Sequence, residues 1–322
     1  MRRPDFFIVG APRCGTTFMY TFLRMHPDVF MPDLKEPDFF CPDLDSGSDR
    51  DSQLFTRDLA AYLSLFAEAR AESRVGEASS GYLFSDVAAQ RIKQFDARAA
   101  IIIQLREPVE EMYSYHNIRF VFGGEDVGFE RALELESERR EGRHLPGDGR
   151  NAKMSIYRAV ASYVPQVARY LEVFARDQVH ITIYEDLQAD PAGTYRATLN
   201  FLGLDSSFSP PTRIVNAGMR PRFKPLFRIL HSRSTSRGAR RVIPARWHHA
   251  AGSLVSKAQR ITRREDPRPA LDPTLRAELE LSFHSEVEEL SELLGMDLVA
   301  RWYGSRPLKP THEAAEVVVA DS

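Results

Sequence analysis

Cysteine is scarce in this chain of 322 residues, which contains only Cys14 and Cys41. Two thiols at this spacing match neither a disulfide framework nor a metal-ligand pattern, so a reducing compartment is the simpler expectation. No run of about 18 apolar residues occurs, which argues against a transmembrane helix. The first apolar segment begins within about five residues of the first methionine, leaving no room for a signal peptide. We therefore expect a cytoplasmic protein.

A strong charge of either sign is also missing. The formal net charge is −2, so no overall field selects nucleic acid as a partner. Hydrophobic residues make up 43% of the chain, enough for a sizeable core. We expect one domain over residues 1–304 and a disordered tail over 305–322. Within the domain, 121–155 is rich in Gly, Glu and Arg and predicts an exposed insertion, and 157–174 predicts an amphipathic helix with a kink or restart at Pro165.

A phosphate-binding loop without its usual lysine follows the first apolar segment. Residues 10–15 have the G-x-x-x-x-G frame and Thr17 stands at the Ser/Thr position, but Thr16 replaces the lysine and a cation is found at Arg13 instead. Backbone amides and a helix N-terminus can still hold a phosphate. Without that lysine the geometry for a β- or γ-phosphate with magnesium is lost, which favours a phosphorylated nucleotide other than ATP. The alternative is a strand-to-helix turn that binds nothing.

An apolar run over 101–105, interrupted only by Gln104, predicts a buried parallel strand. Arg106 follows at the carboxyl end, the edge where open α/β sheets bind ligands. A proline two residues later can begin the next helix, which places Ser114 about two turns along it. A forked guanidinium and a hydroxyl suit a terminal phosphate. The alternatives are a structural salt bridge for Arg106 and a surface position for Ser114.

These motifs, in this order, resemble the sulfotransferase superfamily, whose members use 3′-phosphoadenosine 5′-phosphosulfate (PAPS) as sulfuryl donor. The resemblance rests on the loop at 13–17, a helix ending in His-Pro at 26–27, Lys-Glu-Pro-Asp-Phe-Phe at 35–40 and the segment 106–114, with a weaker match at 179–191. It extends over about 6–224 and is nearest to the heparan-sulfate sulfotransferases and their bacterial relatives. The implied fold is α/β, a P-loop-like, mostly parallel sheet with helices on both faces, as the alternation of strand and helix patterns also indicates.

The resemblance implies how PAPS would be bound. The loop would hold the 5′-phosphosulfate, while Arg106 and Ser114 would hold the 3′-phosphate. Phe18 and Tyr184 would flank the adenine, although core packing is an alternative for both. On this basis the residues assigned to the nucleotide are Arg13, Cys14, Gly15, Thr16, Thr17, Phe18, Arg106, Ser114, Tyr184, Arg220 and Arg222.

The resemblance also implies an in-line displacement that needs no metal. Arg13, where relatives normally have lysine, would stabilise the leaving oxygen, although arginine cannot donate a proton. Glu36 resembles the general base that takes the acceptor proton, with a salt bridge in its own loop as the alternative. Lys35 could help bind the sulfonate. Glu77 is a second candidate base or a structural residue, and His116 is a further candidate base. The candidates for contact with the acceptor are Lys35, Glu77 and His116.

Two features bear on the acceptor. Residues 213–264 include many Arg and Lys residues but no Asp or Glu, and their beginning resembles a lid over the cofactor. Over 228–264 the alternatives are contact with an anionic acceptor or membrane surface and a merely solvated face. An acidic helix over 271–294 would close the fold. Ala78 stands where heparan-type relatives have lysine, which weakens the case for a heparan-like acceptor.

The favoured function is PAPS-dependent sulfation of a hydroxyl, or less readily an amine, of a small molecule or glycan by a cytoplasmic bacterial enzyme. A P-loop kinase is the alternative enzyme, but it would need a lysine at position 16 and an acid where Arg106 ends the strand. The second alternative is a non-catalytic nucleotide-binding protein of the same fold. It is favoured only by the arginine that replaces lysine at position 13 and by the cation missing at Ala78. Nothing in the sequence indicates an oligomeric state.

Overall fold

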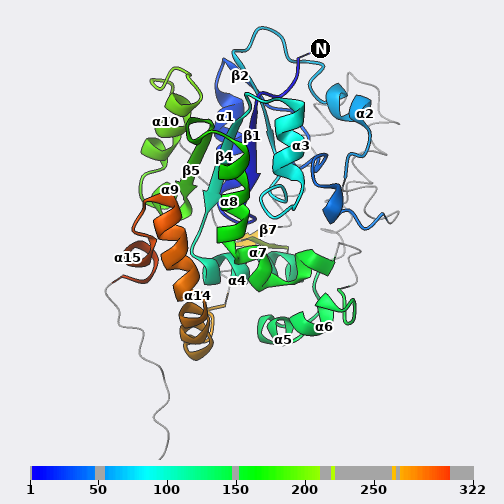
Figure 1. Ribbon diagram of the computed structural model, residues 1–322, viewed down its shortest axis with the longest axis vertical. Coiled ribbons are helices and arrows are strands. Elements are labelled where there is room, and N and C mark those ends of the chain that lie inside the picture. The colour runs from blue at the N-terminus through cyan, green and yellow to red at the C-terminus, as the bar shows by residue number, and fades with distance from the viewer. Residues whose placement is uncertain are drawn as a thin grey trace, which may run out of the picture.

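The computed structural model describes residues 2–47, 55–146, 152–210 and 269–304, together with the backbone of 219–221 and 263–265. Its main feature is a five-stranded sheet in the order β2-β3-β1-β4-β5 (Figure 1). Every neighbouring pair in this sheet is parallel, which confirms the expected α/β fold. The strands are β1 (Phe6–Gly10), β2 (Val29–Phe30), β3 (Arg74–Ala78), β4 (Ala100–Leu105) and β5 (Val179–Ile183).

Different helices cover the two faces of the sheet, because successive side chains of a strand point to opposite sides. Phe7 and Val9 of β1 belong to a buried cluster with residues of α3 (Ala88–Phe95), α8 (Tyr163–Val173) and α14 (Pro273–Leu294). Phe6 and Ile8 point the other way, into a cluster with α1 (Thr16–Met25) and α10 (Pro191–Phe201). Figure 1 shows α3 and α8 over the sheet face turned to the viewer. The result is a three-layer arrangement with both faces of the sheet buried.

Local sequence determines how the helices near the site begin. The Glu107 carboxylate caps α4 (Pro108–Phe122) by accepting two backbone N–H groups of the first turn, both at 2.8 Å. The Asp190 side chain caps α10 by accepting the Gly193 N–H at 2.8 Å, with a proline at the first helical position. At α1, by contrast, Gly15 offers no side-chain cap and the first turn holds no acidic residue. The positive end of the α1 dipole is therefore available to an anion.

The expectation that 121–155 is an exposed insertion is wrong around Glu125 and Arg139, although 140–145 is exposed. Arg139, with only 1% of its surface exposed, donates to both carboxylate oxygens of Glu125 at 2.9 Å. The Tyr157 hydroxyl donates to the same carboxylate at 2.8 Å. This paired and hydrogen-bonded charge can be buried because each partner is compensated. It ties α6 (Glu136–Arg140) to the segment before α5 (Phe129–Glu134) and to α7 (Tyr157–Ala161), and Arg139 also donates to the Ser155 carbonyl in η3 (Ala152–Ser155).

The remaining elements complete the chain order. The helical pattern over 157–174 is interrupted at Ser162, between α7 and α8, so Pro165 lies in the first turn of the second helix. β6 (Met219–Pro221) and β7 (Arg263–Glu265) pair antiparallel and so join the two ends of the basic stretch. The rest of that stretch and the tail at 305–322 lie outside the described residues. The others are η1 (Pro42–Leu44), α2 (Leu59–Ser64), η4 (Arg176–Gln178), α9 (Tyr184–Ala189) and α15 (Leu298–Tyr303).

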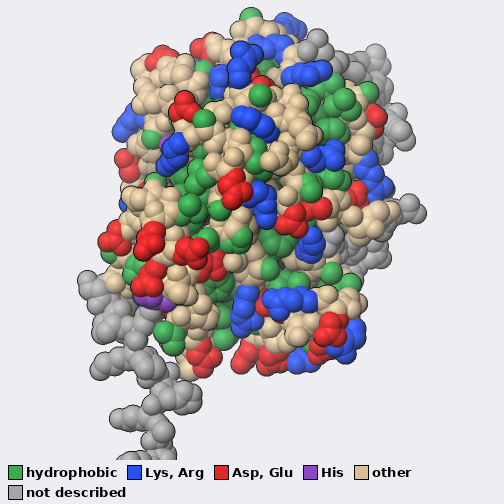
Figure 2. All heavy atoms as spheres, in the orientation of Figure 1, with side chains coloured by type: hydrophobic (Ala, Val, Ile, Leu, Met, Phe, Trp, Pro, Cys, Tyr) green, Lys and Arg blue, Asp and Glu red, His purple; other side chains and the backbone are tan. Residues whose placement is uncertain are grey.

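Charges of both signs are interspersed over the face shown in Figure 2, and acidic side chains gather where α14 and α15 lie. α14 occupies the range in which an acidic closing helix was expected. Within the described residues, no helix is both long enough and apolar enough to cross a bilayer.

Candidate functional site

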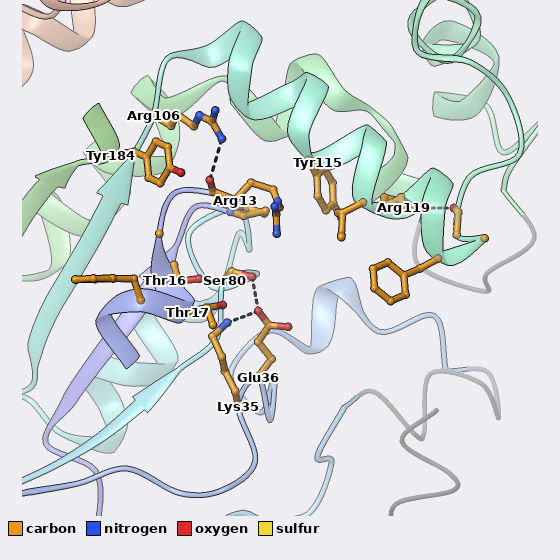
Figure 3. A pocket seen from close by; sticks show the side chains of 17 residues that line it. Arg13, Thr16, Thr17, Lys35, Glu36, Ser80, Arg106, Tyr115, Arg119 and Tyr184 are labelled. Atoms are coloured by element: carbon orange, nitrogen blue, oxygen red, sulfur yellow. Dashed lines mark hydrogen bonds and ion pairs between the residues drawn. The ribbon is translucent and has the colours of Figure 1, made fainter. Parts of the chain in front are cut away.

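A cleft of about 510 Å³ opens beside the carboxyl ends of the strands (Figure 3). Its walls come from segments that follow β1, β2, β3, β4 and β5, because the carboxyl ends of parallel strands meet at one edge of the sheet. The cleft thus brings together residues that are far apart in sequence. Those lining it are Pro12, Arg13, Gly15, Thr16, Thr17, Phe18, Lys35, Glu36, Ser80, Arg106, Tyr115, Ile118, Arg119, Phe122, Gly123, Gly124 and Tyr184.

The phosphate loop has the shape that an anion requires. Gly15 has φ +91°, and a Cβ there would lie 2.6 Å from Leu187 Cδ2, so a side chain does not fit. The turn directs the uncapped amino end of α1 at the cleft, where Thr16 and Thr17 form the first helical positions. The uncapped first turn of α1, the positive end of its dipole and the two threonines therefore lie together at the cleft, the arrangement expected of a phosphate site.

Arg13 supplies the central cation of the cleft. Its Nε donates to Ser114 Oγ at 3.1 Å. Burial, reinforced by the nearby Arg106 charge, lowers the pKa of the Arg13 guanidinium, but arginine stays protonated in proteins. Ser114 does not line the cleft and is 8% exposed. The structure thus places the Ser114 hydroxyl where it orients Arg13, whereas the prediction had paired it with Arg106 around a 3′-phosphate.

Arg106 lies at one end of the cleft, against the face of Tyr184, with 4.5 Å between its guanidinium carbon and the ring centroid. Its Nη2 donates to Glu110 Oε2 at 3.0 Å, and Nη1 lies 3.4 Å from the Arg13 carbonyl. Glu110 also contacts Arg276 of α14. The salt bridge considered as an alternative for Arg106 therefore exists, through a glutamate one turn into α4.

Glu36 and Lys35 lie between the two ends of the cleft in Figure 3. Glu36 Oε1 accepts hydrogen bonds from Lys35 Nζ at 2.7 Å and Ser80 Oγ at 2.9 Å. The Glu36 side chain keeps 33% of its surface exposed. Glu36 thus forms the salt bridge that was the alternative to a catalytic role, and it also lines the cleft. The two are compatible because the ion pair leaves the Glu36 carboxylate partly exposed.

Besides Ser114, three predicted site residues do not line the cleft. Cys14 is fully buried with its Sγ 3.3 Å from the Pro12 carbonyl, and burial raises the pKa of this thiol well above its usual value. Glu77 is fully buried among hydroxyl groups, and desolvation raises its pKa to about 7. His116 Nε2 lies 2.9 Å from the Val127 carbonyl, and burial lowers the pKa of the imidazole.

Two further predictions cannot be placed. Arg220 belongs to β6 by its backbone only, and the placement of its side chain is outside the described residues. Arg222 lies outside them altogether. The described part of the chain contains no group of three or more His, Cys, Asp or Glu side chains that could hold a metal.

Sequence reasoning did not identify Ser80, Gln104 and Glu111 as parts of this region. Ser80 reaches Glu36 directly. Gln104 and Glu111 lie behind the loop, and within the described structure the side-chain oxygens and nitrogen of both have no hydrogen-bond partner. Desolvation raises the pKa of Glu111 well above its usual value against the opposing effect of Arg106 and Arg13. The signal available for Gln104 was a polar residue inside an apolar strand.

Comparisons with known proteins agree on one class. The model of the sulfotransferase domain family matches residues 3–224. Mouse (Mus musculus) carbohydrate sulfotransferase 15 is 26% identical over 246 residues, which cover 62% of this chain and 44% of that protein. Human (Homo sapiens) heparan sulfate glucosamine 3-O-sulfotransferase 6 is 27% identical over 203 residues, which cover 63% of this chain and 53% of that protein. The chain thus spans only about half the length of these curated relatives.

A solved structure extends the likeness to nearly the whole chain. The crystal structure of a sulfotransferase from Alicyclobacillus acidocaldarius matches with a TM-score of 0.71 and 30% sequence identity. The match covers 94% of this chain and all of that one.

Proposed function

The chain belongs to the sulfotransferase family, and we propose that it transfers a sulfuryl group from PAPS to a hydroxyl of a small molecule or glycan. One observation carries the proposal: the phosphate loop with Arg13, the Arg106–Tyr184 pair and Glu36 all line a single cleft. Such a cleft offers binding groups for the two phosphate-bearing ends of a nucleotide, and it offers a carboxylate that can accept a proton. The kinase alternative lacks support, because Thr16 stands where its lysine would be.

The residues present fit PAPS as donor substrate. The uncapped end of α1 with Thr16 and Thr17 would hold the 5′-phosphate. Arg106 would hold the 3′-phosphate by exchanging Glu110 for the phosphate oxygens, since a guanidinium bonds either anion with the same fork. The Tyr184 ring, which already lies under Arg106, is available to the adenine.

Catalysis would then consist of positioning, charge stabilisation and one proton transfer. Glu36 would accept the proton of the acceptor hydroxyl as its oxygen forms a bond to sulfur. The bond between sulfur and the bridging oxygen of the 5′-phosphate breaks, and Arg13 would stabilise the charge that this oxygen gains. The products are a sulfate ester and adenosine 3′,5′-bisphosphate. Lys35, 2.7 Å from Glu36, would offer a second cation to the sulfonate oxygens.

The acceptor would enter from the end of the cleft opposite Tyr184. The α4 residues Tyr115, Ile118 and Phe122 line this end. Arg119 is also there, but its buried guanidinium donates to carbonyl groups and the Ser155 hydroxyl. A smaller cavity of about 50 Å³ continues past Glu36 and is lined in part by Leu44, Phe55 and Met154. Among the described residues, the side chains that line this end are mainly apolar or aromatic. They therefore favour a small hydroxyl compound with an apolar part over a polyanionic glycan.

Transfer of labelled sulfate tests the proposal. The protein is incubated with ³⁵S-labelled PAPS and a panel of aryl alcohols, alkyl alcohols and glycan oligosaccharides. We expect adenosine 3′,5′-bisphosphate and a labelled ester in equal amounts, with aryl or alkyl alcohols as the better acceptors. Arg13→Ala should abolish the transfer, and Arg131→Ala, in an exposed ion pair outside the cleft, is the matched control. A protein that binds PAPS without ever forming an ester would contradict the catalytic proposal.

A further inference from the structure

We propose that Glu77 is a positioning residue, which acts through Ser79 and Tyr82 to hold the loop 36–40 and so to aim the Glu36 carboxylate into the cleft. We call Glu77, Ser79 and Tyr82 the Glu77 bridge. The proposal rests on the proposed role of Glu36 and adds the hydrogen bonds that hold the Glu36 loop in position.

The loop that carries Glu36 has a backbone that needs support. Glu36 has φ +59° and Asp38 has φ +52°, both in the left-handed region that residues with a side chain seldom adopt. Such conformations persist only where the surrounding structure holds them. The segment after β3 provides that support, because Ala78 accepts the Glu36 N–H at 2.8 Å and Ser80 donates to the Glu36 carboxylate.

The Glu77 bridge supports the other half of the loop. Glu77 Oε1 accepts from Ser79 Oγ at 2.6 Å, and Oε2 accepts from the Tyr82 hydroxyl at 3.1 Å. Ser79 Oγ in turn accepts the Asp38 N–H at 3.2 Å. The Tyr82 hydroxyl accepts the N–H groups of Phe39 at 3.0 Å and Phe40 at 3.3 Å.

Above its pKa of about 7, the ionised Glu77 carboxylate can only accept hydrogen bonds, and this fixes the direction in which the two hydroxyls donate. A hydroxyl has one proton to donate, and both Ser79 and Tyr82 give theirs to Glu77. Their lone pairs are therefore directed at the successive N–H groups of 38–40. All three bridge residues are fully buried, so water cannot replace a lost bond. Since Glu77 does not line the cleft, it acts through the loop rather than on the acceptor.

The chain contains a matched control for this bridge. The Tyr62 hydroxyl also donates to Glu77 Oε2, at 2.7 Å, and Tyr62 is as fully buried as Tyr82. Within the described structure, Tyr62 OH bonds the carboxylate but no backbone group of the loop. Tyr82→Phe and Tyr62→Phe therefore delete the same atom beside the same carboxylate, and only the first releases the N–H groups of Phe39 and Phe40.

Amide hydrogen exchange on the full chain measures how well the loop N–H groups are protected, and it needs no acceptor substrate. We expect exchange in peptides covering 38–40 to be at least about tenfold faster in Tyr82→Phe than in the wild type and in Tyr62→Phe. Tyr82→Phe should also lose more melting temperature than Tyr62→Phe, because it leaves the N–H groups of Phe39 and Phe40 unpaired as well. The faster exchange should therefore be confined to 38–40 and be absent from the β1 and β4 peptides of the same variant. Equal loop protection in both variants would overturn the proposal. If Tyr82→Phe does not fold, Ser79→Ala tests the same point through the Asp38 amide.

Turnover separates positioning from plain stability. The probes are PAPS with 2-naphthol and PAPS with water alone, followed by release of adenosine 3′,5′-bisphosphate. In Tyr82→Phe we expect kcat to fall about ten- to hundredfold while the Kd for adenosine 3′,5′-bisphosphate is unchanged, since displacement of a catalytic group costs rate rather than cofactor binding. Tyr62→Phe should stay within about twofold of the wild-type kcat. Similar kcat losses in both variants would contradict the bridge.

The two proposals fail in different ways. A wild-type protein that does not bind adenosine 3′,5′-bisphosphate would contradict the proposed function. The exchange experiment would still decide whether Tyr82 and Glu77 hold the loop.

Discussion

Replacing Glu36 with glutamine removes the proposed proton acceptor while leaving its surroundings nearly intact. The amide oxygen can still accept the Ser80 hydrogen bond, which measures 2.9 Å in the wild type. The ion pair with Lys35 is lost, but both side chains are partly exposed, so the effect on the free energy of unfolding should stay below about 1 kcal/mol. General-base catalysis is worth about 10²–10⁴-fold in rate. At about 1.4 kcal/mol per factor of ten, this is roughly 3–5.5 kcal/mol of transition-state stabilisation.

The assay measures kcat with labelled PAPS and the best acceptor found, together with the Kd for adenosine 3′,5′-bisphosphate. For Glu36→Gln we expect kcat to fall by about 10²–10⁴ and Kd to stay within about twofold. Glu134→Gln, which removes a glutamate from an exposed ion pair on α5, is the matched control and should keep wild-type kcat. Near wild-type kcat in Glu36→Gln would refute the reasoning and make Glu36 a structural residue.

Three other substitutions give distinct outcomes. Arg106→Ala should remove about 2–4 kcal/mol of the preference for adenosine 3′,5′-bisphosphate over 5′-AMP in calorimetry; a retained preference would place the 3′-phosphate elsewhere. Glu111→Gln should change the free energy of unfolding in urea at pH 7 by less than about 1.5 kcal/mol, because burial raises the Glu111 pKa well above its usual value and so favours the neutral acid, which glutamine resembles; a loss of about 3–5 kcal/mol would indicate an ionised partner of the arginines. Burial raises the Glu77 pKa from 4.5 to about 7, so the folded state holds an extra proton between these values. Stability should therefore fall by up to about 3 kcal/mol as pH rises from about 4.5 to 7 and then level off; Glu77→Gln should remove this contribution, and an unchanged pH slope in urea unfolding would contradict the shift.

Local signals in the sequence were sufficient to predict the α/β class and several of its elements. The apolar run at 101–105 forms β4, Pro108 begins α4 at its first position, and the helical pattern at 157–174 forms α7 and α8. These features depend on residues within a few positions of one another. The buried Glu125–Arg139 pair does not: its partners are 14 residues apart, and the same composition is typical of a solvated loop.

The site was predictable where a motif fixes the backbone and not where the result depends on side-chain direction. Arg13, Glu36 and Arg106 line one cleft as their motifs indicate. Cys14, inside the same loop, points into the core, because a tight turn sends neighbouring side chains opposite ways. The hydrogen bond from Arg13 to Ser114 joins residues 101 positions apart, and no local pattern reports such a pairing.

The cleft should bind a nucleotide that has a 3′-phosphate and no γ-phosphate. Isothermal titration calorimetry of the wild-type protein compares adenosine 3′,5′-bisphosphate with Mg-ATP. The phosphate loop without a lysine, together with Arg106 as the proposed partner of the 3′-phosphate, predicts far tighter binding of adenosine 3′,5′-bisphosphate. Equal or tighter binding of Mg-ATP would contradict the account.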